Sequence, residues 1–413
     1  MTGAATGAAP SVAAAPGSPP GQDFVMPTYA RYPLTLVRGE GRTVWDDAGD
    51  AYLDMAGALG ANPLGHGHPA WRHAVHDQVD ALDITTNLFA TTPQAALAQR
   101  LAELLPIPDA RTFFCNSGAE ANEAAIKLVR RHGLAGGRPT VVALEGSFHG
   151  RTIATLAATG QPTKRAPFEP LVDWVRFVAP NDLPGLKSEL AAGDVAGVLL
   201  EPVLGEGGVR PLSRAFLRGA REACDASGAL LIADEVQAGL GRCGGWLAIT
   251  DADVIPDVVT LAKGLGGGLP IGACVTRADL AFGPGEHGST FGGGPIPSAA
   301  AFAVLRTIED DGLLAKAHEL GGRLRNEITR LSPPGLVSEV RGRGLLIGVQ
   351  LTRPLAHEVV LAMISEGVLA SEAGADVVRL SPALTVTSQE IDGAVAALAA
   401  ALAAVAERRE WAR

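Results

Sequence analysis

Short, continuous apolar segments alternate with segments of helical periodicity between residues 112 and 261, and this alternation restricts the possible folds more than any other feature. Side chains of a strand point alternately to the two faces of a sheet, so a strand without polar positions must be buried on both faces. A parallel sheet whose strands are joined by covering helices meets this requirement, and we therefore predict an α/β fold with a mostly parallel sheet. The predicted strands are 112–115, 140–144, 174–178, 195–200, 230–233 and 258–261, and the predicted helices are 94–105, 119–131, 184–192 and 214–227.

The two ends of the chain differ from this central region. Residues 44–54 alternate apolar and polar side chains around an Ala-Gly-Asp turn, which predicts a β-hairpin. After Pro295, long helical patterns at 296–310 and 313–331 precede a smaller α+β segment. In that segment we predict strands near 337–341, 346–351 and 377–380 and helices near 355–366 and 388–409. The predicted division is a disordered tail (1–23), the first part of a small domain with a connecting segment (24–90), a large domain (91–295), and linking helices with the rest of the small domain (296–413).

Composition and charge exclude several classes of protein. The 413 residues carry 34 Lys and Arg against 44 Asp and Glu, a formal net charge of −10, so no basic face is expected to neutralise the phosphates of a nucleic acid. No run of 18 or more apolar residues occurs, which predicts no transmembrane helix. Residues 1–23 are almost all Ala, Gly, Pro, Ser and Thr and contain no basic side chain. A secretory signal or a transit peptide needs basic residues, so we predict a disordered tail on a cytoplasmic protein.

Four cysteines, Cys115, Cys224, Cys243 and Cys274, form no C-x-x-C pair and have no histidine at metal-ligand spacing. Three of them lie in or beside apolar segments, which is typical of small buried side chains in a reducing compartment. The sequence therefore predicts neither a disulfide framework nor a metal site.

A carboxylate and a lysine follow two successive predicted strands. Asp234 ends the segment L-L-I-A-D, and Lys263 comes directly after V-V-T-L-A. The carboxyl ends of parallel strands meet in one crevice, so both side chains are expected to face the same ligand. Burial turns a lysine into a nucleophilic amine, and a carboxylate can keep a pyridine nitrogen protonated. Each residue alone also fits an ordinary role, as a solvent-reaching lysine or a turn cap, but the pair indicates pyridoxal 5′-phosphate chemistry.

The segment F-F-C-N-S-G-A-E-A-N-E predicts an anion site where a strand runs into a helix. The small residues Ser117, Gly118 and Ala119 would let backbone N–H groups approach a phosphate at the helix N-terminus, although a capped helix without a ligand is the alternative. No G-K-[ST] follows, so this is not a Walker loop. The run G-L-G-G-G-L-P-I-G at 264–272 is a poor dinucleotide fingerprint, because Pro270 interrupts the helix that such a fingerprint requires.

The segment S-F-H-G-R-T follows the predicted strand 140–144. Phe148 could stack on a flat ring, and the planar guanidinium of Arg151 could grip a carboxylate. We assign His149 a structural role. A core phenylalanine and a surface arginine are the alternative for this segment.

Two glycine-rich loops carry further polar side chains. Glu206 lies in E-P-V-L-G-E-G-G-V, and Ser289 and Thr290 offer hydroxyl groups in H-G-S-T-F-G-G-G. Glycines in such loops permit close approach of the backbone to a ligand, although plain turns are the alternative.

Together these motifs resemble the class III, ornithine-type aminotransferases, and within them the bacterial N-acetylornithine aminotransferases. The resemblance covers about residues 29–398 and includes L-G-H-G-H-P, C-N-S-G-A-E-A-N-E, S-F-H-G-R-T, D-E-V-Q-A-G-L-G-R, L-A-K-G-L-G-G-G and H-G-S-T-F-G-G in the family's order. It implies a fold-type-I architecture with a mostly parallel seven-stranded sheet in the large domain, covered by helices, and a small α+β domain from both chain ends. It also implies pyridoxal 5′-phosphate as cofactor and a homodimer with shared active sites.

The resemblance further implies a role for each matching residue. Lys263 holds the cofactor through a Schiff base and transfers the proton, and Asp234 pairs with the pyridine nitrogen. The other residues implied at the cofactor are Ser117, Gly118, Ala119, Phe148, Glu235, Val236, Gln237 and, across the dimer, Thr290. The residues implied at the substrate are Arg151, Ser289, Glu206 and Arg379, of which the last two resemble the family's switch pair.

The implied reaction transfers the amino group of N2-acetyl-L-ornithine to 2-oxoglutarate, giving N-acetyl-L-glutamate 5-semialdehyde and L-glutamate, a step of arginine biosynthesis. The chain departs from the family's pattern near the pocket at Leu204, Ala90, Thr92, Ala238 and Gly294. Ornithine, succinylornithine, succinyldiaminopimelate or another ω-amine is therefore an alternative donor. Remote alternatives are a nicotinamide-dependent dehydrogenase, which needs a better glycine fingerprint, and a non-catalytic regulator, which needs an added DNA-binding module.

Overall fold

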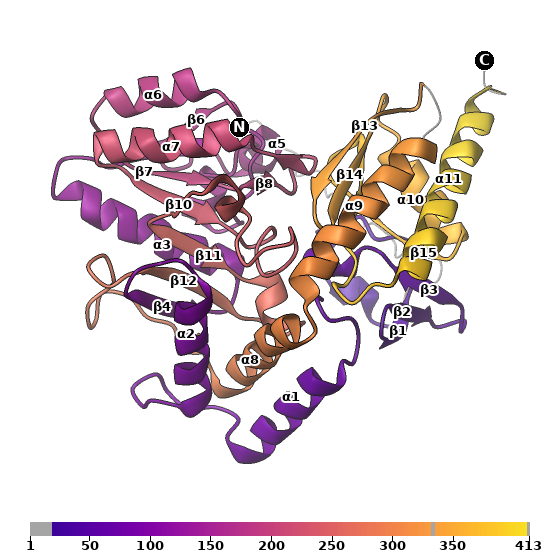
Figure 1. The fold of residues 1–413 in the computed structure, drawn as a ribbon, viewed down its shortest axis with the longest axis horizontal. Helices are drawn as coiled ribbons and strands as arrows, with labels where there is room; N and C mark the ends of the chain where they lie inside the picture. The colour runs from indigo at the N-terminus through magenta and orange to yellow at the C-terminus, as the bar shows by residue number, and fades with distance from the viewer. Residues whose placement is uncertain (1–18, 332–334, 411–413) are drawn as a thin grey trace, which may run out of the picture.

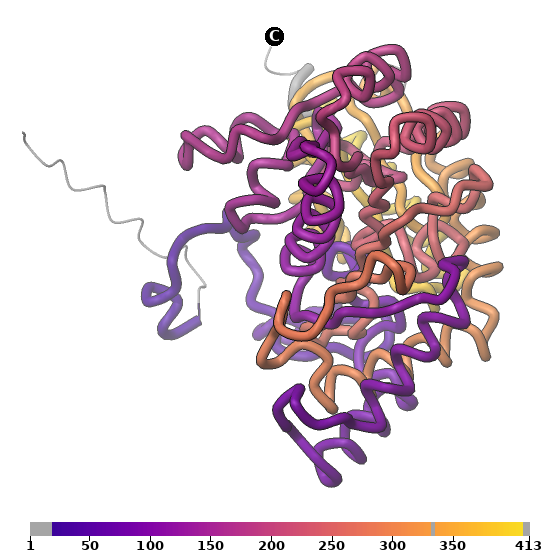
Figure 2. Tube along the Cα trace, turned by 90° about the vertical axis from the view of Figure 1, so that its left-hand side faces the viewer, coloured from indigo at the N-terminus to yellow at the C-terminus, as the bar shows by residue number. Residues whose placement is uncertain are grey.

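The computed structural model describes residues 19–331 and 335–410, which form two connected lobes (Figure 1). Most of the predicted tail lies outside the described residues, and a short 3₁₀ helix, Gln22–Phe24, lies at its predicted end. Figure 2 shows that the indigo N-terminal segment projects away from the rest of the chain.

One lobe is built around a seven-stranded sheet, as the resemblance implies. Along the sheet the strands are β4 (Ala110–Cys115), β12 (Gly272–Arg277), β11 (Val258–Leu261), β10 (Leu230–Asp234), β7 (Val195–Leu200), β5 (Thr140–Leu144) and β6 (Val175–Val178). Strand β12 is antiparallel to both of its neighbours, and the remaining pairings are parallel. The sequence patterns did not predict β12, because its segment G-A-C-V-T-R mixes small and polar residues and follows a glycine-rich run.

Both faces of this sheet are buried, which explains the continuous apolar strands. In β5, Val142 and Leu144 enter the core on one face, and Val141 and Ala143 enter the core on the other. The first core also contains side chains of α2 (Thr92–Leu104), α6 (Leu183–Ala191), α7 (Arg214–Ser227) and α8 (Pro295–Asp310), whereas α3 (Gly118–Leu134) packs on the second face. The helices therefore cover the sheet on two sides, as predicted.

The other lobe joins residues from both ends of the chain. One of its sheets has the order β1 (Leu36–Glu40), β2 (Thr43–Asp46), β3 (Ala51–Asp54) and β15 (Val368–Leu369). The second sheet has the order β13 (Val337–Arg343), β14 (Leu346–Leu351), β17 (Val377–Leu380) and β16 (Ser371–Glu372). Helices α9 (Leu313–Leu331), α10 (Ala356–Ser365) and α11 (Ser388–Glu410) pack with these strands around a separate apolar core (Figure 1). The predicted hairpin is present as β2 and β3.

Besides β12 and the 3₁₀ helix Gln22–Phe24, several elements were not predicted. They are β1, β15, β16, α1 (Pro69–Ala81), α4 (Ile153–Ala157), α5 (Pro162–Arg165), β8 (Val203–Leu204), β9 (Arg210–Pro211) and the 3₁₀ helices Gly57–Gly60, Ala166–Phe168, Ile249–Ala252 and Lys263–Gly266. Helix α1 lies along α8 but has no buried residue. Its sequence therefore lacks the apolar stripe by which most helices are recognised.

One helix, within Ser388–Glu407 of α11, is long and apolar enough by length and composition to cross a membrane. Its most apolar window is 44% buried inside the protein, where Ile391, Leu398 and Leu402 enter the core shared with α9 and α10. The alanine-rich composition of α11 thus serves close packing of a core helix.

Adjacent glycines in α9 test how closely this helix packs on the turn between β13 and β14. A Cβ atom at Gly321 would lie 1.9 Å from the carbonyl oxygen of Gly344, whereas one at Gly322 would meet nothing within 4 Å. We expect Gly321→Ala to lower the free energy of unfolding by about 1–3 kcal/mol through this clash. The matched Gly322→Ala should instead raise it by about 0.5–1 kcal/mol, because alanine favours a helix. Urea denaturation of both variants measures the difference, and equal shifts would contradict the packing described.

Candidate active site

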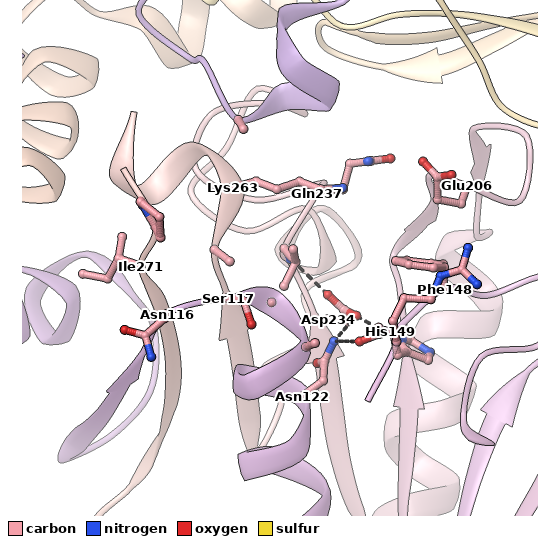
Figure 3. A pocket seen from close by; sticks show the side chains of 18 of the residues that line it. Asn116, Ser117, Asn122, Phe148, His149, Glu206, Asp234, Gln237, Lys263 and Ile271 are labelled. Atoms are coloured by element: carbon pink, nitrogen blue, oxygen red, sulfur yellow. Dashed lines mark hydrogen bonds and ion pairs between the residues drawn. The ribbon is translucent and has the colours of Figure 1, made fainter. Parts of the chain in front are cut away.

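A cavity of about 420 Å³ lies at the carboxyl ends of the central strands of the seven-stranded sheet (Figure 3). It is the place that an open α/β sheet offers to a ligand. The predicted site residues that line it are Ser117, Gly118, Ala119, Phe148, Arg151, Glu206, Asp234, Val236, Gln237 and Lys263. These residues come from five separate segments, so the fold brings together most of the residues that the sequence singled out.

Lys263 follows β11 and extends into the cavity in Figure 3. Its backbone φ of 39° lies in the left-handed region, which is unfavourable for a residue with a side chain and is often found at functional sites. Burial lowers the pKa of the Lys263 amine to about 8, and the attraction of Glu206 limits that fall. A substantial fraction of the amine is therefore uncharged just above neutral pH and can act as a nucleophile or a base.

Asp234 is the last residue of β10 and is almost fully buried. One carboxylate oxygen, Oδ2, accepts a hydrogen bond from Asn122 Nδ2 at 2.7 Å and lies 2.7 Å from His149 Nδ1. The other, Oδ1, accepts from the backbone N–H of Val236 at 3.1 Å. Thr260 donates to Asn122 Oδ1 at 2.7 Å, which turns the amide N–H₂ of Asn122 toward Asp234. This network fixes the carboxylate at the bottom of the cavity (Figure 3).

The residues of the predicted anion site lie at the N-terminus of α3. Ser117 is the N-cap, and its hydroxyl accepts from the backbone N–H of Glu120 at 3.1 Å, while Glu120 reaches back to the N–H of Asn116 at 2.5 Å. A Cβ atom at Gly118 would lie 2.8 Å from Val236 Cγ1, so only glycine fits there without a shift. The first N–H groups of a helix have no partner within it and can bind a phosphate at this position.

A buried ion pair lies on the far side of the cavity. Arg379 of β17 donates through Nη1 to Glu206 Oε1 at 2.5 Å, and it is 1% exposed. Burial alone would raise the pKa of Glu206, but the charge and hydrogen bond of Arg379, together with the charges of Lys263 and Lys164, outweigh burial and hold that pKa below its usual value. Gln237 Oε1 lies 3.4 Å from the same Nη1 atom, so the pair also contacts a residue of the cavity wall.

Four predicted site residues do not line the cavity. Glu235 points away from it, and its buried carboxylate accepts hydrogen bonds from the backbone N–H groups of Ala248 and Ile249, so the prediction of Glu235 as a cofactor ligand is wrong at the level of its side chain. Arg379 lies behind Glu206, and Ser289 accepts from Asn116, which does line the cavity, at 3.3 Å. Thr290 is exposed.

Among the lining residues that the sequence did not assign to the site, four have polar side chains. They are Asn116, Asn122, His149 and Glu201. The buried carboxylate of Glu201 accepts from the N–H groups of Phe148 at 2.8 Å and Gly205 at 3.1 Å, and burial raises its pKa to about 7. Glu201 directly follows β7, so the strand-end rule that identified Asp234 would also have found it. Asn122 is a polar residue on the apolar side of α3, which was a usable signal, whereas nothing local distinguished His149.

Comparisons with known proteins agree with this geometry. The family model described as Aminotransferase class-III matches residues 25–402. The acetylornithine aminotransferase of Mycolicibacterium smegmatis is 49% identical over 93% of this chain and 97% of its own length, and that of Thermosynechococcus vestitus is 46% identical over 92% and 96%.

Solved structures of similar proteins include ornithine aminotransferase from Toxoplasma gondii, with a TM-score of 0.89, 31% identity, and coverage of 94% of this chain and 95% of that one. They also include N-acetylornithine aminotransferase from Stenotrophomonas maltophilia, with a TM-score of 0.81, 37% identity, and coverage of 92% and 98%. Sequence, fold and pocket lead to the same conclusion: the chain belongs to the class III aminotransferases.

Proposed function

We propose that this protein transfers the amino group of N2-acetyl-L-ornithine to 2-oxoglutarate with pyridoxal 5′-phosphate as cofactor, a step of arginine biosynthesis. The observation that carries the chemistry is the Lys263 amine and the fixed Asp234 carboxylate in one cavity. The donor is proposed because relatives at 46–49% identity over nearly the whole chain are acetylornithine aminotransferases.

The residues of the cavity fit this cofactor. The N-terminus of α3, with Gly118 packed against Val236, would hold the phosphate, and the Asp234 carboxylate would pair with the protonated ring nitrogen. Phe148 offers an aromatic face in the cavity for the ring. When bound, pyridoxal 5′-phosphate supplies an electron-accepting ring that makes the C–H bond beside the substrate's amino group acidic.

Lys263 is the group that moves this proton. Its uncharged amine would accept the proton from the carbon that bears the substrate's amino group and give it to the cofactor within the same half-reaction; the second half-reaction, with the oxoacid, would use the same transfer in reverse. The lowered pKa of about 8 matches this task, because burial keeps a fraction of the amine uncharged. Asp234 would stabilise the protonated ring nitrogen by its negative charge. The hydrogen bonds from Asn122 and Val236 hold the carboxylate in place for this role.

The pair of Glu206 and Arg379 would allow one cavity to accept two kinds of substrate. Acetylornithine ends in a neutral amide, whereas 2-oxoglutarate carries a second carboxylate. While the pair is closed, the charges of Glu206 and Arg379 cancel; when it opens, Arg379 can bind the second carboxylate with its planar guanidinium. Arg151, exposed at the cavity wall, would anchor the carboxylate common to both substrates.

We further propose that the enzyme is a cytoplasmic homodimer in which Thr290 contributes to the partner's site. Asn87 donates to the carbonyl groups of Ser289 and Gly292, so the segment before α2 lies beside the Thr290 loop. Three large apolar side chains of these two segments are exposed: Leu88 at 88%, Phe89 at 67% and Phe291 at 61%. A second copy of the chain would cover this apolar surface and bring Thr290 to its cofactor.

Hydride reduction of the holoenzyme followed by peptide mapping should find the pyridoxyl group on Lys263. Lys263→Ala should lower the rate of transamination by at least about 10²–10⁴-fold, because the proton acceptor is removed. Lys164 is the internal control, since its amine lies 3.8 Å from Glu206 near the same cavity. A label on Lys164 or any other lysine would contradict the assignment.

Thr290→Val should weaken binding of pyridoxal 5′-phosphate about 10- to 150-fold, because one hydrogen bond to a charged phosphate is lost. The hydroxyl of Thr290 has no partner within the described part of the chain, so the monomer fold should be unaffected. Fluorescence titration with the cofactor measures the effect, and Thr290→Ser is the matched control that keeps the hydroxyl. Full activity of a monomer at high dilution would rule out shared sites.

Arg379→Ala should slow the half-reaction with 2-oxoglutarate by about 10²–10³-fold and the half-reaction with acetylornithine far less, since only the former uses the free guanidinium. Glu206→Ala should leave Arg379 unpaired and favour glutamate over acetylornithine as donor. Single-turnover absorbance changes for each half-reaction separate the two effects. Equal losses in both halves for a folded Arg379→Ala variant would reduce Arg379 to a structural role.

A further inference from the structure

Glu206 has a second cationic neighbour besides Arg379. While its Oε1 atom accepts from Arg379, its Oε2 atom lies 3.8 Å from the Nζ atom of Lys164 in the short helix α5. The same Nζ atom lies 4.7 Å from the centre of the Phe148 ring. Lys164 therefore lies beside two residues that line the cavity, between the aromatic ring and the carboxylate.

This arrangement bears on the charge left behind when Arg379 is used. The side chain of Glu206 is only 23% exposed, so its carboxylate is poorly solvated. If Arg379 binds a substrate carboxylate, Glu206 loses its 2.5 Å partner, and a poorly solvated anion without a partner is strongly unfavourable. Some other cation has to compensate for that charge, or opening the pair would cancel the benefit of binding the substrate.

We propose that Lys164 is this second partner, a positioning residue that holds Glu206 while Arg379 binds the distal carboxylate of 2-oxoglutarate. The proposal rests on the proposed function, and it adds a specificity determinant to the same site. In the closed state the Glu206 carboxylate bridges the two cations; in the open state the contact with Lys164 shortens from 3.8 Å to an ordinary ion pair.

The electrostatics around Lys164 agree with such a role. Burial lowers the pKa of the Lys164 amine, Glu206 opposes this shift, and the positive charges of Arg151 and Arg379 add to it. Removing Arg379 from Glu206 would leave Lys164 as the ion-pair partner of the carboxylate, beside the charge of Lys263, and would therefore strengthen the attraction between Lys164 and Glu206. The lysine and the arginine compete for one anion, which allows the carboxylate to pass from one to the other.

The test compares Lys164→Met, which keeps the length of the side chain without its charge, with Lys164→Arg, which keeps the charge. Lys187→Met, on the exposed side of α6, is a charge-matched control away from the cavity. Single-turnover measurements should show that Lys164→Met weakens binding of 2-oxoglutarate about 10-fold, with the acetylornithine half-reaction changed less than about twofold. Lys164→Arg should restore most of the loss. No change, or equal losses in both half-reactions, would overturn the proposal.

A double variant separates action through Glu206 from direct contact with the oxoacid. If Lys164 acts through the pair, Lys164→Met should have little further effect when Arg379 is already alanine. A full 10-fold effect in that background would mean direct binding and would overturn the proposal. Failure of the proposed function looks different: neither acetylornithine nor 2-oxoglutarate would change the absorbance of the wild-type holoenzyme.

Discussion

Several segments of the candidate active site contact one group, the carboxylate of Asp234. Its oxygens accept hydrogen bonds from Asn122 on α3 and from the turn after β10, and they contact His149 on the loop after β5. Because Thr260 of β11 orients Asn122, four segments of the large sheet and its helices meet around one charge. A buried carboxylate is tolerated only with such a set of donors. Because β10 and β11 are parallel neighbours, the pairing of the sheet places Lys263, which follows β11, at the same edge as Asp234.

The strand-end rule explains why much of the site could be predicted from the sequence. Lys263, Asp234 and the 117–119 segment follow buried strands, and the strands themselves were recognisable because both faces of the sheet are covered. Arg379 and the role of Thr290 across the dimer came only from the family resemblance, since neither residue lies at the carboxyl end of a strand in that sheet. The mixed direction of the sheet was missed at β12, where the residues are too small and polar to form a recognisable apolar run.

The errors have local physical causes. Glu235 follows Asp234 directly, and neighbouring residues at a strand end point to opposite sides, so its carboxylate binds the N–H groups of Ala248 and Ile249 instead of facing the cavity. The structural role assigned to His149 holds only in part. The side chain is buried, yet it lies 2.7 Å from Asp234 and lines the cavity. His149 and Asp234 are 85 positions apart, so the six-residue motif S-F-H-G-R-T could not predict their contact.

The geometry also limits how the pair of Glu206 and Arg379 can open. Glu201 accepts hydrogen bonds from the N–H groups of Phe148 and Gly205, which ties the backbone beside Glu206 to the end of β7. At Gly205 a Cβ atom would lie 1.6 Å from Gln237 Oε1, so the loop is already in close contact with the cavity wall. Arg379 is equally confined, because its other nitrogen atoms donate to Ser371 Oγ and to the carbonyl group of Glu372. The opening that we propose must therefore come from rotation of the Glu206 side chain, whose free oxygen already faces Lys164, while both backbones stay in place.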